Sequence, residues 1–131
     1  MRYTPEYITE LKPYEIFVYG SNQYARHGAG AARTAERYFG AKVGVAPHGL
    51  CGQSYGIITT SFNSSPIMLD MIKKQVEVLY DFAMLRTDLD FLVTKIGTNL
   101  AGFSIQDIAQ IFFDLESVRP SNIILPKEFH K

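Results

Sequence analysis

Two short glycine-containing segments hold the residues best suited to chemistry in this chain. Residues 20–30 read GSNQYARHGAG, and residues 97–104 read GTNLAGFS. Glycine and alanine let backbone N–H groups approach a ligand closely, and a helix that begins after such a segment adds free N–H donors and a partial positive charge. The pattern predicts a cleft that binds a phosphate, or a diphosphate bridging the two segments, through main-chain amides and without a lysine.

Two side chains of the first segment are candidates for catalysis. His27 titrates near neutral pH, so it can act as an acid or a base or can contact a phosphate, and it can equally be an exposed loop histidine. Asn22 can position a water molecule or a ribose hydroxyl, or can stabilise a turn. Elsewhere, His48 and Cys51 supply two of the about four ligands that zinc requires, so we expect no metal site and no cofactor.

Each glycine-containing segment is expected to connect an apolar strand to a helix. Apolar, β-rich runs bounded by turn residues predict strands, and alanine-rich or periodic runs predict helices. Residues 43–54 contain several glycines and are predicted to be mostly loop. The expected strands are residues 15–19, 55–59, 91–96 and 122–125, and the expected helices are residues 28–40, a helix starting near Ser65 and Pro66, and a helix from Ser104 to about residue 116.

Local signals set the expected ends of the last two helices. Ser65 can accept hydrogen bonds from the first turn and Pro66 suits the first helical position, while Ser104 and Asp107 form a capping-box pattern. Apolar residues after Pro66 recur at steps of three and four, which predicts a helix face buried in the core. The residues of this face are Met68, Met71, Ile72, Val76, Leu79, Phe82 and Ala83.

The alternation of strands and helices predicts an α/β protein with a layered, largely parallel sheet. In open sheets of this kind, ligands bind beyond the carboxyl ends of the strands. Both glycine-containing segments follow a strand, so we expect both at that edge of the sheet, with the N-termini of their helices directed at the same place.

Composition narrows the class of protein further. The chain has 131 residues, which fits one domain, and 13 basic residues balance 13 acidic ones. A net charge of zero argues against general binding to nucleic acids or to a membrane surface. One cysteine, no apolar run of about 18 residues and no signal-peptide pattern predict a soluble cytoplasmic protein, located in the host cytoplasm if the gene is viral. The oligomeric state is not predicted.

Four pieces of the sequence, taken in order, resemble the macrodomain family, in particular small macrodomain-like proteins of bacteria and phages. These pieces are FVYGSN (residues 17–22), RHGAGAA (26–32), GQSY (52–55) and IGTNLAGF (96–103). The resemblance implies a single domain over residues 1–131 with a three-layer α/β/α fold that binds ADP-ribose. It also implies that hydrolysis of an ADP-ribosyl bond is possible, because some members remove ADP-ribose from proteins or nucleic acids.

The resemblance also implies which residues contact the ligand. Residues 28–31 would lie nearest the diphosphate, residues 98–103 would form a second phosphate loop, and Phe103 would lie near the distal ribose or the adenine. The full predicted set is Gly20, Ser21, Asn22, Gly28, Ala29, Gly30, Ala31, Gln53, Ser54, Gly97, Thr98, Asn99, Leu100, Ala101, Gly102 and Phe103.

Two positions depart from the pattern of the family. In one glycohydrolase branch, a lysine after the second strand attacks the sugar and an acid in the second loop assists, and here Thr60 and Ala101 replace them. We therefore expect a module that binds ADP-ribose or a related nucleotide diphosphate. The alternatives are a hydrolase of such a ligand that uses Asn22 and His27, and a ligand-free interaction or scaffold protein.

Overall fold

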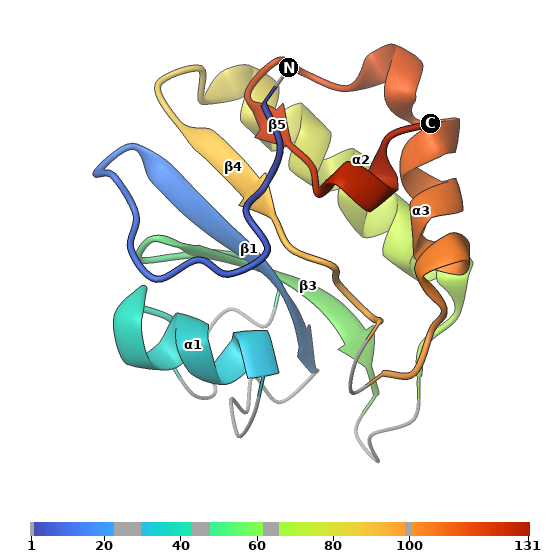
Figure 1. Cartoon of the computed structure of the whole chain (residues 1–131), viewed down its shortest axis with the longest axis horizontal. Coiled ribbons are helices and arrows are strands. Elements are labelled where there is room, and N and C mark those ends of the chain that lie inside the picture. Colours follow the sequence, from blue (N-terminus) through green and yellow to red (C-terminus); the bar gives the residue numbers. More distant parts are fainter. Residues whose placement is uncertain (1, 23–29, 43–47, 62–65, 99–100) are drawn as a thin grey trace.

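The computed structural model describes residues 2–22, 30–42, 48–61, 66–98 and 101–131 (Figure 1). Its strands are β1 (Glu15–Asn22), β2 (Gly49–Cys51), β3 (Ser54–Thr60), β4 (Asp90–Val93) and β5 (Ile123–Ile124). Its helices are α1 (Gly30–Tyr38), α2 (Leu69–Leu85) and α3 (Ile105–Asp114), with single 3-10 turns at η1 (Glu116–Val118) and η2 (Lys127–Phe129).

The five strands form one mixed sheet in the order β2-β3-β1-β4-β5. The strand β1 lies at the centre and is parallel to both β3 and β4, and β5 is parallel to β4. Only β2 is antiparallel within this sheet, beside β3. Helix α1 covers one face, and α2 and α3 cover the other (Figure 1). The predicted three-layer α/β/α fold with a mostly parallel sheet is confirmed.

Alternation along β1 divides the apolar side chains between two cores. Successive side chains of a strand point to opposite faces, so Ile16 and Val18 join the larger core under α2 and α3, and Phe17 and Tyr19 join the smaller core under α1. The smaller core is completed by Ala32, Ala35, Phe39 and Ala41. Alanines at the helix surface let α1 lie close to the aromatic rings of β1.

The start of α2 differs from the prediction. Met68, not Ser65, is the residue that precedes the helix, and Ser65 lies outside the described residues. Pro66 instead forms an isolated antiparallel bridge with Thr60, and the N–H of Ile67 donates to the carbonyl of Thr59 at 3.2 Å. Because the chain follows the end of β3 up to Ile67, the helix can begin only after it.

The later start also changes which residues of the predicted apolar face are buried. Met68 is 67% exposed and Met71 is 49% exposed, so neither belongs to the core. The rest of the face behaves as predicted: Ile72, Val76, Leu79 and Ala83 are buried, and Phe82 packs against the core.

Other element bounds also differ from the sequence prediction by a few residues, and one strand was not predicted. β2 was not predicted, because three residues beside glycines carry no strand pattern. β4 ends at Val93, and the N–H of Ile96 donates to the carbonyl of Thr94, which turns the chain sharply. The Ser104 cap is confirmed, since its hydroxyl accepts a hydrogen bond from the N–H of Asp107 at 3.0 Å, and α3 ends at Asp114 before the turn η1.

The segment before β1 is tied to the far edge of the sheet. Thr4 is buried, its N–H donates to the carbonyl of Leu125 at 2.8 Å, and its hydroxyl donates to the carbonyl of Ile124. Phe129 stacks on Phe112 of α3, with ring centroids 4.9 Å apart. The segment around Thr4 is therefore held at β5, and the segment around Phe129 is packed against α3. Within the described ranges, no helix has the length and apolar character needed to cross a membrane.

Asn122 is predicted to be a major local contributor to stability. Its side-chain amide donates to three carbonyls near the end of α2, those of Ala83, Arg86 and Leu89, at 2.9–3.1 Å. The substitution Asn122→Ala removes this shared donor, although the carbonyls of Ala83 and Arg86 keep backbone donors, and should lower the free energy of unfolding by about 1–3 kcal/mol, measured by urea denaturation.

Two further variants test this assignment. Asn122→Asp keeps the size of the side chain but places a carboxylate against the three carbonyl oxygens, so it should destabilise more than alanine. Ser121→Ala changes an exposed neighbour and should leave the urea midpoint unchanged. An Asn122→Asp protein as stable as the parent would contradict the assignment.

Candidate functional site

The two glycine-containing segments start side by side at one edge of the sheet. β1 and β4 are parallel neighbours, so their carboxyl ends point the same way. A Cβ added to Gly20 would lie 3.4 Å from the backbone N of Gly97 and 3.2 Å from the hydroxyl of Thr59. The first residues of the two segments, Gly20 and Gly97, therefore lie next to each other, as predicted. His27, Gly28 and Ala29 lie outside the described residues.

A close backbone turn shapes the second segment. Gly97 has a φ of +75°, and its carbonyl accepts a hydrogen bond from the N–H of Phe103 at 2.9 Å. A Cβ at Gly97 would lie 3.1 Å from Ile108 and 3.2 Å from the ring of Phe103, so only glycine fits without displacing its neighbours. Phe103 is partly buried against the larger core, and Ala101 is buried. Asn99 and Leu100 lie outside the described residues.

The two helices at this edge differ in charge. Ser104 already caps α3, and Asp107 places a carboxylate in its first turn. No acidic residue lies in the first turn of α1, which begins at Gly30. Since a helix N-terminus carries a partial positive charge, α1 offers an anion the more favourable end of the two.

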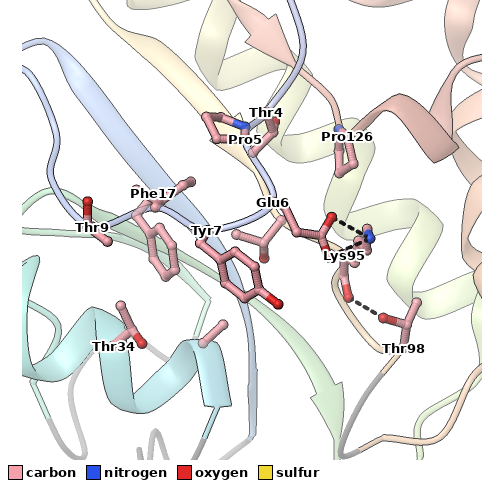
Figure 2. Close-up of a pocket in the computed structure, with 13 residues that line it drawn as sticks. Thr4, Pro5, Glu6, Tyr7, Thr9, Phe17, Thr34, Lys95, Thr98 and Pro126 are labelled. Atoms are coloured by element: carbon pink, nitrogen blue, oxygen red, sulfur yellow. Dashed lines mark hydrogen bonds and ion pairs between the residues drawn. The ribbon is translucent and has the colours of Figure 1, made fainter.

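A pocket of about 580 Å³ lies between the N-terminal segment, α1 and the chain that follows β4 (Figure 2). Ala31 from α1 and Thr98 from the second glycine-containing segment both line it. The pocket thus lies between the helix that follows the first glycine-containing segment and the second segment itself. The complete lining is Thr4, Pro5, Glu6, Tyr7, Ile8, Thr9, Phe17, Ala31, Thr34, Thr94, Lys95, Thr98 and Pro126.

The chemistry of the lining is mixed. Phe17, Ile8 and Ala31 supply apolar surface, and several threonine hydroxyls supply hydrogen-bonding groups. The hydroxyl of Thr98 donates to the carbonyl of Lys95 at 2.7 Å, which fixes the turn after β4 (Figure 2). Apolar walls with a few placed polar groups, in a volume of this size, are typical of small-molecule sites.

The cation of the pocket, Lys95, is held between two carboxylates. Its ammonium lies 2.9 Å from Glu6 of the N-terminal segment and 2.9 Å from Glu128 of η2. The hydrogen bonds to Glu6 and Glu128 raise the pKa of Lys95, and the bond to Lys95 lowers the pKa of Glu128. Lys95 and Glu128 therefore stay charged at neutral pH, and two carboxylates lie against the one ammonium group.

Two predicted residues lie at the opposite end of the sheet. Ser54 is buried at the first position of β3, and its hydroxyl donates to the carbonyl of Phe39 at 2.9 Å. The side chain of Gln53 donates to the carbonyls of Lys12 and Glu15, at the start of β1. The length of β3 lies between these two residues and the edge where Gly20 and Gly97 meet. Neither Gln53 nor Ser54 lines the pocket, which corrects the expectation that they line the same cleft as the glycine-containing segments.

The last residues of β1 lie beside the end of β3. Asn22 is paired with Thr60, after a shift in register at Ser21. Ser21 is buried, and its carbonyl accepts a hydrogen bond from the hydroxyl of Thr59 at 3.3 Å. Thr60 is thus the neighbour of Asn22 on the adjacent strand.

The N-terminal segment is the part of the pocket that sequence reasoning missed. Residues 4–9 follow neither a helix nor a strand pattern, and nothing local places them beside the glycine-containing segments. Their position depends on the contacts of Thr4 with β5, which the sequence pattern does not reveal. No group of three metal-ligating side chains was found among the residues that the structure describes.

Comparison with known proteins supports the fold. No protein-family model matches the chain, and neither does any curated protein. The structure is similar to that of a protein of unknown function from Bacteroides thetaiotaomicron, with a TM-score of 0.62, 11% sequence identity and 90% of each chain covered. At this identity the similarity shows a shared fold and nothing about function.

The close packing around Gly97 makes a prediction about stability. Gly97→Ala adds a Cβ that meets Ile108 and Phe103, whereas Gly102, which also has a positive φ (+80°), has open space at the same point. Both substitutions share the cost of the left-handed backbone. Gly97→Ala should therefore lower the free energy of unfolding by about 1–3 kcal/mol more than Gly102→Ala, measured by urea denaturation. Equal losses would show that the site tolerates the added methyl group.

Proposed function

We propose that this protein binds ADP-ribose or a related nucleotide diphosphate at the carboxyl edge of its sheet. The observation that carries the proposal is the pocket to which both α1 and the segment after β4 contribute, through Ala31 and Thr98. A nucleotide diphosphate has an anionic centre and an uncharged nucleoside end, and the edge offers a different environment for each.

The N-terminus of α1 favours the anionic centre. Its first turn lacks an acidic side chain, and Gly30 begins the helix directly before the pocket residue Ala31. Backbone N–H groups there can bind a phosphate without a basic side chain, which is consistent with a chain of zero net charge.

The pocket favours the uncharged end. Lys95 is already paired with two carboxylates, so a phosphate in the pocket would face a local excess of negative charge. An aromatic base and a ribose instead match the apolar surface of Phe17 and Ala31, and the hydroxyl of Thr94, which donates to the carbonyl of Val18 at 2.8 Å, can still accept a hydrogen bond.

The experiment that tests the proposal is a calorimetric titration with ADP-ribose. The parent protein should give saturable heat. Ala31→Phe places a ring in the pocket and should abolish that heat, because the ring occupies the volume that the ligand needs. Arg37→Phe, an exposed position in the last turn of the same helix, is the matched control and should bind as the parent does.

Thermal unfolding of both variants shows whether each protein is folded. No heat with the parent protein would overturn the proposal and would favour a ligand-free interaction or scaffold protein. Undiminished binding by a folded Ala31→Phe protein would place the ligand elsewhere.

Turnover is tested separately with an ADP-ribosylated protein as substrate. With Thr60 and Ala101 in place of a lysine and an acid, we expect no release of free ADP-ribose. If the parent protein releases free ADP-ribose and Asn22→Ala does not, the protein is a hydrolase and the proposal of a binding module without turnover is wrong.

A further inference from the structure

Three exposed residues lie over the pocket between two fixed points. Thr4 is buried and hydrogen-bonded to β5, and Ile8 packs against the smaller core under α1. Between them, Pro5, Glu6 and Tyr7 are exposed, and all three line the pocket. Within the described structure, no backbone hydrogen bond holds residues 5–7 to the rest of the protein. We call residues 5–7 the strap.

The strap carries an aromatic ring that the fold itself does not use. Tyr7 is 84% exposed although it lines the pocket. In Figure 2 its ring lies between Thr34 of α1 and the turn that holds Lys95 and Thr98. A planar ring at this position can cover the flat face of a nucleobase, and contact of this kind stabilises a bound base.

The side chain of Glu6 attaches the strap to the turn after β4. Glu6 pairs with Lys95, and Lys95 is held independently by Glu128 of η2. Lys95 therefore stays in position when Glu6 leaves. An exposed ion pair contributes little to stability, so this contact can break and form again without disturbing the fold.

We propose that the strap closes over the ligand, with Tyr7 as the contact to the base and the Glu6–Lys95 ion pair as the latch. This inference rests on the proposed function, because it assigns a covering element to the same pocket. Opening moves residues 5–7 away from α1 while Thr4 and Ile8 remain attached. Closing returns Glu6 to Lys95 and lays Tyr7 on the bound ring.

Calorimetry with ADP-ribose tests the contact. Tyr7→Ala should weaken binding about tenfold, the size typical for loss of one base–aromatic contact. Tyr38→Ala is the matched control, because Tyr38 is also largely exposed, at 69%, but lies at the end of α1 and does not line the pocket. Equal affinities of the two variants, with the parent protein binding normally, would overturn the inference and leave the proposed function intact.

A fluorescent variant reports the same contact directly. The chain has no tryptophan, so Tyr7→Trp introduces one indole, at the mouth of the pocket. Saturation with ADP-ribose should change its emission and protect it from iodide quenching. An indole that remains fully quenched by iodide when calorimetry shows saturation would contradict closure.

The latch is tested without any ligand, by limited digestion with chymotrypsin. Glu6→Gln removes the charge that pairs with Lys95, so cleavage after Tyr7 should be severalfold faster than in the parent protein. Glu10→Gln, at an exposed position outside the pocket, should cleave at the parental rate. Equal cleavage of Glu6→Gln and the parent would overturn the latch, whether or not ADP-ribose binds.

Discussion

The parallel pairing of β1 with both β3 and β4 is the constraint on which the site depends. Because all three strands run the same way, the last residues of β1 and the turn after β4 lie at one edge of the sheet. The two segments come so close there that a Cβ added to Gly20 would lie 3.4 Å from the backbone N of Gly97. A larger residue at position 20 would press on Thr59 and on that backbone. The absence of a side chain at Gly20 thus permits the close approach of β1 to the turn after β4. This approach helps to bring α1 and that turn to one pocket.

The sequence predicted the elements whose patterns are local and missed those fixed by distant contacts. The apolar runs of β1, β3 and β4 and the cap at Ser104 were identified because strand pattern and capping chemistry act over a few residues. The start of α2 was wrong, because the bridge between Pro66 and Thr60 overrides a favourable capping pattern. The short strand β2 was missed for a related reason, since it is defined by pairing with β3 and not by its own composition.

In the candidate site, too, the features set by local patterns were predicted and those set by distant contacts were missed. The placement of residues 20 and 97 at the same edge followed from the parallel strand direction, which the alternating pattern predicted, whereas the pairing of β1 with β4 was not predicted. Gln53 was misplaced because its position was taken from the resemblance, whereas a residue that precedes β3 lies at the amino end of that strand, away from the carboxyl ends. The strap of residues 5–7 had no signal at all, because its position depends on Thr4 bonding to β5, more than 100 residues later in the chain.

The distribution of charge at the edge favours a ligand with two unlike parts over a simple anion. Inorganic phosphate would use only the N-terminus of α1 and would gain nothing from the pocket, where two carboxylates surround one lysine. A nucleoside alone would fill the pocket but would leave the helix N–H groups to water. The proposed ligand joins a phosphate group to a ring and a sugar and would satisfy both environments at once. Because neither part needs a free basic side chain, such binding is compatible with equal numbers of acidic and basic residues in the chain.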